Sequence, residues 1–107
     1  MKGKIPDYIP KQAEFINPTI DALHELGGFG KNDEIYDKVI KIMNLSDEAI
    51  NYPHLGSERQ TEVQYKLAWA RTYLKAYGIL DNSERSVWII TPECRNVRDV
   101  DSAKIML

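Results

Sequence analysis

The sequence has few of the features that mark secreted, membrane-bound or disulfide-stabilised proteins. It contains one cysteine, Cys94, so no disulfide can form within the chain. No apolar run approaches the ~20 residues that a helix needs to cross a bilayer. No apolar stretch follows the N-terminal lysines, as it would in a secretory signal. We therefore expect a cytoplasmic protein with no membrane partner.

An excess of charge of one sign is also missing. Lysine and arginine number 14 against 16 aspartates and glutamates, which gives a net charge of −2. This balance excludes a strongly cationic nucleic-acid binder, although it leaves room for a local basic face. A chain of 107 residues is too short for a doubly wound nucleotide-binding sheet, a TIM barrel or most two-substrate enzymes. What remains is one small domain with one hydrophobic core.

Candidate catalytic and metal-binding groups are equally scarce. The histidines, His24 and His54, lie far apart in the sequence, and neither stands at metal-ligand spacing from Cys94. Residues 27–31 superficially suggest a phosphate loop, but they follow a predicted helix and lack the terminal Gly-Lys-Ser/Thr. The sequence thus predicts no catalytic residue, no metal ligand and no cofactor.

Helix-start and helix-stop residues divide the N-terminal half into helical segments. We expect helices at about 18–26 and 33–43, and a short helix or turn at 47–51. Each follows a residue whose side chain can cap the first turn, namely Asn17, Asn32 and Ser46. Pro18 suits the first helical position, and Gly27 with Gly28 ends the first helix. Phe29, which comes directly after these glycines, is expected to fill the core.

The longest helix is expected to end at Tyr77, before Gly78. Two capping boxes are candidates for its start, Ser57 with Gln60 and Thr61 with Gln64. Helical periodicity places an apolar face inward, with Leu67, Trp69, Ala70 and Leu74 among its members. Tyr73 and Tyr77 lie on the same face, where packing is favoured over stacking on bases. The opposite face carries Gln64, Ala68, Arg71, Thr72 and Lys75.

After Gly78 the hydrophobic pattern changes from a helical to a strand period. Residues 79–80 and 87–91 are aliphatic, β-branched or aromatic, and they flank the polar turn 81–86. This pattern predicts a β-hairpin directly after the long helix. Thr91 and Pro92 then predict the start of a final helix.

The order of these elements is typical of a winged helix-turn-helix, so the fold class is mainly α with a small β-hairpin. The long helix is expected to be the recognition helix, and the hairpin turn the wing. We expect the winged-helix domain at 15–100, an N-terminal arm at 1–14 and a C-terminal tail at 101–107.

Three segments resemble the N-terminal domain of Mrr-type restriction endonucleases. They are residues 45–48, 69–80 and 85–91, and the middle segment is the most specific. The resemblance extends over about 6–95 and implies a winged helix that binds double-stranded DNA for a restriction system. Ser86 stands where that family has a wing glycine, so the wing turn is expected to take another shape.

In that family a separate C-terminal nuclease domain of the PD-(D/E)xK type cuts modified DNA with a divalent metal. No aspartate or glutamate stands two positions before any lysine in this sequence, so the nuclease motif is absent. We therefore expect no enzymatic activity on this chain itself. Its expected partners are DNA, including modified DNA, and either a nuclease domain in a longer parent protein or, for a stand-alone relative, no such domain.

Six polar residues are the candidate DNA contacts: Gln60, Thr61, Gln64, Arg71, Lys75 and Arg85. The first three could read base edges, and the three cations could contact phosphates. Asp81 and Glu84 in the wing would repel a phosphate backbone. The alternative is a winged helix used for protein–protein interaction or as a homodimerisation domain, which the weak net charge favours.

Overall fold

The computed structural model describes residues 5–57 and 59–107. The helical elements in chain order are η1 (Gln12–Phe15), α1 (Ile16–Glu25), α2 (Asn32–Ile42), α3 (Asp47–Asn51), α4 (Glu62–Tyr77), η2 (Pro92–Cys94) and α5 (Ser102–Ile105). The strands are β1 (Phe29–Lys31), β2 (Leu80–Glu84) and β3 (Val87–Ile90). The expected fold class is confirmed, because the chain is mainly helical with a small antiparallel sheet, compatible with a winged helix.

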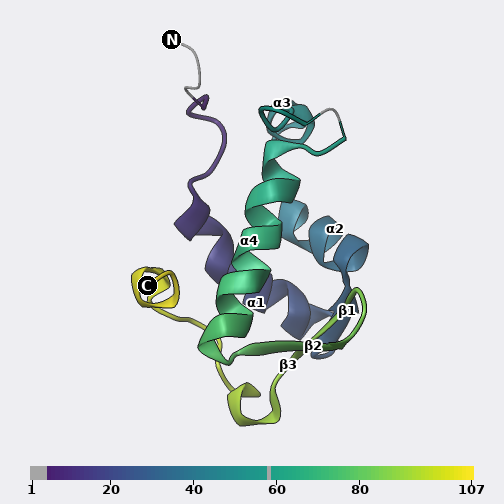
Figure 1. Ribbon diagram of the computed structural model, residues 1–107, viewed down its shortest axis with the longest axis vertical. Coiled ribbons are helices and arrows are strands. Elements are labelled where there is room, and N and C mark those ends of the chain that lie inside the picture. Colours follow the sequence, from purple (N-terminus) through teal and green to yellow (C-terminus); the bar gives the residue numbers. More distant parts are fainter. Residues whose placement is uncertain (1–4, 58) are drawn as a thin grey trace.

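Helix α4 forms the centre of the molecule, with α1 behind it, α2 on one side and α5 on the other (Figure 1). The β2–β3 hairpin follows α4 and extends toward the start of α2 (Figure 1). Within the described residues, no helix combines the length and the apolar character that a bilayer span requires.

The sheet has a third strand that the sequence did not predict. The strand order is β1-β3-β2, with all pairs antiparallel. Gly30 of β1 lies opposite Trp88, and a Cβ atom built on Gly30 would lie 2.8 Å from Leu26 Cδ1. Only glycine therefore fits at this position without a shift of Leu26. A three-residue strand centred on glycine carries almost no strand signal, which explains why the sequence did not reveal it.

Two expectations about the first helix are wrong. Helix α1 continues directly from η1, so Asn17 lies inside the helix and is not its N-cap. Its amide bonds the backbone of Val100 instead, donating to the carbonyl at 3.1 Å and accepting from the N–H at 2.9 Å. Phe29 is 60% exposed, because strand alternation turns Gly30 inward and Phe29 outward. The buried phenylalanine of the core is Phe15.

The capping signals in the middle of the chain are mostly confirmed. The Ser46 hydroxyl accepts from Ala49 N at 3.1 Å at the start of α3. Thr61 and Gln64 form the capping box of α4, and Gly78 ends that helix in the left-handed region with φ 100°. The N-cap of α2 is Lys31 and not Asn32, whose side chain accepts a hydrogen bond from Trp88.

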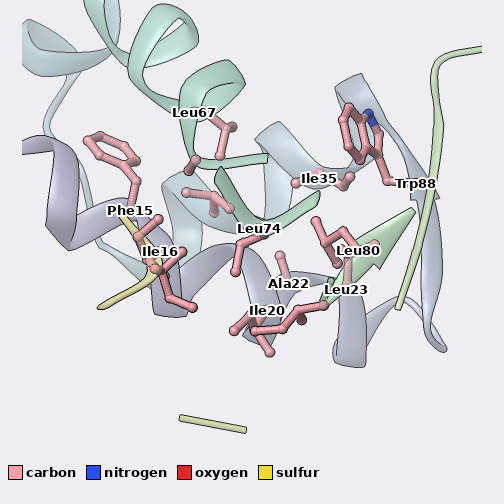
Figure 2. Close-up of a cluster of buried hydrophobic side chains, with 14 of the residues drawn as sticks. Phe15, Ile16, Ile20, Ala22, Leu23, Ile35, Leu67, Leu74, Leu80 and Trp88 are labelled. Atoms are coloured by element: carbon pink, nitrogen blue, oxygen red, sulfur yellow. The ribbon is translucent and has the colours of Figure 1, made fainter. Parts of the chain in front are cut away.

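The core lies between α1, α2, α4 and the hairpin (Figure 2). Helix α4 contributes Val63, Leu67, Ala70 and Leu74, all of them buried. Trp69 is 42% exposed, so the expectation that it points into the core is wrong. The buried stripe repeats at i, i+4, i+7 and i+11, and Trp69 lies on the flank of that stripe.

The C-terminal segment differs from the expected final helix. Only one 3-10 turn forms at Pro92–Cys94, because the Thr91 hydroxyl donates to the carbonyl of Gly78 at 3.0 Å instead of capping a helix. A short helix, α5, follows, and its Ile105 is buried against the core. Ile9, in the expected arm, is buried as well. The boundaries of arm, domain and tail stay a prediction.

Strands β2 and β3 are joined at Arg85 and Ser86, so the hairpin turn is tighter than the expected polar turn 81–86. Ser86 has φ 66°, the left-handed conformation that glycine adopts without cost. The serine therefore keeps the backbone geometry of a glycine turn. The pairing of β2 with β3 is irregular between Asp81 and Glu84.

Candidate nucleic-acid interface

The loop before α4 is held in place by a hydrogen-bonded pair, the partly buried His54 and the buried Glu62. His54 Nδ1 lies 2.7 Å from Glu62 Oε1, and the His54 ring stacks on Tyr65 with 3.8 Å between centroids. His54 N also donates to the Gln60 carbonyl at 2.8 Å. These contacts fix the chain that leads into α4, and they give His54 a structural role. His24 is likewise structural, with Nε2 2.7 Å from the Val97 carbonyl oxygen.

The capping box of α4 engages two of the residues predicted to read bases. The Thr61 hydroxyl accepts from Gln64 N at 3.2 Å, and Gln64 Oε1 accepts from Thr61 N at 2.9 Å. The Gln64 side chain is exposed, and its amide nitrogen is left to donate outward. Gln64 therefore keeps a donor for a ligand, whereas the hydroxyl oxygen of Thr61 is occupied by the helix.

Three of the six predicted contacts meet in one recess between α2 and α4. Gln60, Gln64 and Arg71 line it together with residues from the first turns of α2, and its volume is about 430 Å³. Leu67 and Ala68 supply an apolar part of the wall. Helical spacing alone placed Gln64 and Arg71 on one flank of α4, and the packing of α2 makes that flank concave.

Arg71 is the most constrained of these side chains. Its guanidinium carbon lies 5.6 Å from the centroid of the Trp88 ring, within the range of a cation–π interaction. Its Nε atom is buried and has no hydrogen-bond partner among the described residues. Burial lowers the pKa of Arg71 below its ordinary value by desolvation of the cation. Arg71 is therefore positioned by packing, and not by an acidic partner.

Trp88 connects the wing to the recess. Its indole N–H donates to Asn32 Oδ1 at 2.7 Å, and its ring lies against Ile35 in the core (Figure 2). Asn32 is the first residue of α2 and also lines the recess. Asn32 and Trp88 are 56 positions apart in the sequence. Trp88 of β3 thus contacts one recess residue on α2, Asn32, and one on α4, Arg71.

Lys75 and Arg85 lie outside the recess but close to its borders in the fold. Lys75 is exposed and lies one helical turn after Arg71, on the same flank of α4. Arg85 is exposed at the wing turn. Pairing of Lys31 with Val87 places this turn beside the start of α2. Lys75 thus shares a flank of α4 with Arg71, and Arg85 lies on the wing turn next to the start of α2.

The charge on this surface is mixed. Asp33 lines the recess from α2, and Glu34 and Glu84 are exposed on neighbouring elements. Arg59 also lines the recess and adds a cation that was not among the six predicted contacts. Asn32, Asp33 and Trp88 were also missed, because no sequence signal links them to α4. Of these residues only Arg59 had a sequence clue, because it is a basic residue directly before the predicted contact Gln60.

The other flank of α4 carries aromatic side chains. Trp69 and Tyr73 have ring centroids 5.7 Å apart, and Tyr77 follows one turn later with 56% of its surface exposed. Two flanks of one helix thus differ in chemistry, one polar and cationic, the other aromatic. Within the described residues, no group of three or more histidine, cysteine or acidic side chains is arranged to hold a metal ion.

A protein-family model described as the Mrr N-terminal domain matches residues 13–99. The chain belongs to this family. The matched range includes α1 to α4, the three strands and η2, so every element of the candidate interface lies inside the Mrr N-terminal domain. Membership links the chain to Mrr-type restriction proteins. Comparisons with curated proteins and with solved structures found no match.

Proposed function

We propose that this Mrr N-terminal domain binds double-stranded DNA through the polar flank of α4 and the wing. The observation that carries the proposal is the shared flank of Gln64, Arg71 and Lys75, with Arg85 on the adjoining wing turn. A helix of this length fits the major groove, and a wing can reach the neighbouring backbone. Family membership supports the same role.

The two exposed cations, Lys75 and Arg85, suit phosphate contacts. Lys75 and Arg85 make no ion pair within the described residues, so both are free to meet a phosphate. Glu84 beside the wing turn and Asp33 in the recess oppose the approach of the backbone. Binding by the isolated domain is therefore weak, in the micromolar range typical of non-specific association. In a restriction system such a domain would supply target recognition, including recognition of modified DNA, to a cytoplasmic nuclease whose catalytic domain is separate.

Replacing both Lys75 and Arg85 by alanine is expected to weaken binding to every duplex, by roughly 10- to 100-fold at low salt. Loss of two phosphate contacts should also make the slope of log K against log salt concentration less negative by about two. Fluorescence anisotropy with a short labelled duplex measures both effects.

The matched control is the double substitution Arg95→Ala and Lys104→Ala. It removes the same two charges from exposed positions directly after η2 and on α5, away from the recess. DNA binding through α4 and the wing requires the control to bind like the parent, apart from a small general effect of net charge. Equal losses in both variants would show that the polar flank is not the DNA surface.

Protein association is the second candidate function, and the aromatic flank favours it. Trp69 and Tyr77 are large exposed aromatic side chains on α4, and such residues are enriched at protein interfaces. If this flank forms a homodimer, Trp69→Ala with Tyr77→Ala should lower the sedimentation coefficient of the concentrated protein to the monomer value. A parent that stays monomeric at high concentration would contradict self-association. The two flanks are separate, so the two functions do not exclude one another.

A further inference from the structure

We propose that the recess between α2 and α4 receives the edge of a guanine base, and that Arg71 reads it. This inference rests on the proposed DNA binding and deepens it by naming the base.

Arg71 presents a fixed fork to the recess. Nε is buried, so the donors left to face a ligand are those of the terminal nitrogens. The Trp88 ring supports the guanidinium plane, and no carboxylate lies within 4.0 Å of it among the described residues. Two parallel N–H donors in one plane can bond two acceptor atoms that lie side by side. Guanine offers such a pair, O6 and N7, on its major-groove edge.

The rest of the recess suits a base better than a phosphate. Asp33 keeps one oxygen in a hydrogen bond from Glu34 N at 2.9 Å, and its other oxygen can accept only from a donor. A phosphate has no donor to give, whereas the cytosine paired with guanine presents its N4 amino group. Tyr36 also lines the recess, and burial together with nearby Asp37 raises its pKa above the ordinary tyrosine value. Leu67 and Ala68 offer apolar contact to a flat ring.

A guanine edge can come from a paired base in the groove or from an unpaired base that leaves the helix. The chemistry read by Arg71 is the same in both cases. A duplex with one unpaired guanine separates them: tighter binding to it than to the paired duplex assigns an extrahelical base, and equal or weaker binding assigns a base in the groove. Either result leaves the reading of guanine in place.

The test compares two duplexes of one sequence, one with guanine and one with 7-deazaguanine at every guanine position. The replacement removes the N7 acceptor and leaves base pairing and backbone charge unchanged. The parent protein should bind the 7-deazaguanine duplex at least fivefold more weakly, as expected for loss of a bidentate contact. Arg71→Met keeps the length of the side chain but removes every donor, so it should bind both duplexes equally. Arg95→Met makes the same chemical change at an exposed position outside the recess and should keep the preference.

The outcomes separate the inference from the proposed function. Salt-dependent binding of the parent with no preference between the two duplexes overturns the guanine site and leaves DNA binding intact, with a phosphate as the ligand of Arg71. A preference that survives in Arg71→Met also overturns it, because another residue then reads N7. No binding to any duplex at low salt overturns the proposed function itself. Thermal unfolding of Arg71→Met, followed by circular dichroism, confirms that the variant is folded.

Discussion

Replacement of Phe15 by alanine is expected to lower the free energy of unfolding by about 3–5 kcal/mol. Phe15 is fully buried at the junction of η1 and α1, and it packs in the cluster that includes Leu67 and Leu74 (Figure 2). Its loss leaves a cavity that neighbours on three elements cannot fill without moving. In a domain of this size the melting temperature should fall by roughly 10–30 °C. Thermal and urea unfolding measure the effect.

The matched control is Phe29→Ala, the same chemical change at an exposed position. Phe29 points away from the core on the edge strand β1, so its removal should change the free energy of unfolding by no more than about 1 kcal/mol. A large loss at Phe29 with a small loss at Phe15 would mean that the two phenylalanines have exchanged roles. The packing of α1 against the sheet would then be wrong.

Trp88→Ala should cost a similar amount, about 3–5 kcal/mol, and should also weaken DNA recognition. Trp88 is 8% exposed, and its ring supports both the core and the Arg71 guanidinium. Without the ring, Arg71 loses the surface that holds its fork toward the recess. Binding to guanine and 7-deazaguanine duplexes should become equal in this variant.

Trp88→Phe separates the two roles of the tryptophan. Phenylalanine keeps an aromatic ring below Arg71 but cannot donate to Asn32. We expect a loss of about 1–2 kcal/mol in stability, with the guanine preference retained in part. Urea unfolding and anisotropy on the same protein sample provide both readouts. A Trp88→Phe variant as unstable as Trp88→Ala would show that the hydrogen bond to Asn32, and not the ring, joins the wing to α2.

The parts of the fold that sequence could predict are those determined by local chemistry. Ser46, the Thr61–Gln64 box and Gly78 each act on backbone groups within a few residues, so their signals are complete in the sequence. Strand β1 could not be predicted, because its pairing with β3 depends on a segment far along the chain. Asn17 and Asn32 failed as caps for a related reason. The side-chain amide of each residue bonds a residue distant in the sequence instead of capping the helix.

The sequence could predict which candidate residues share a flank of α4. It could not predict which residues of other elements pack beside them. Helical periodicity placed Gln64, Arg71 and Lys75 on one flank, and α4 has that geometry. Periodicity also placed Trp69 inward, because an aromatic residue at the border of an apolar stripe gives no sign of which side it takes. Asp33 and Trp88 border Arg71 only through tertiary packing, so the recess itself had no sequence signature.

The salt dependence of duplex binding by the unmodified protein tests the central claim most directly. If Lys75 and Arg85 contact phosphates, with Arg71 close to the DNA, binding at low salt should be micromolar, and log K should fall with log salt at a slope of about −2 to −3. The measurement is fluorescence anisotropy over a series of salt concentrations. No binding at the lowest salt, or binding that does not change with salt, would contradict the assignment of this domain as a DNA-binding module.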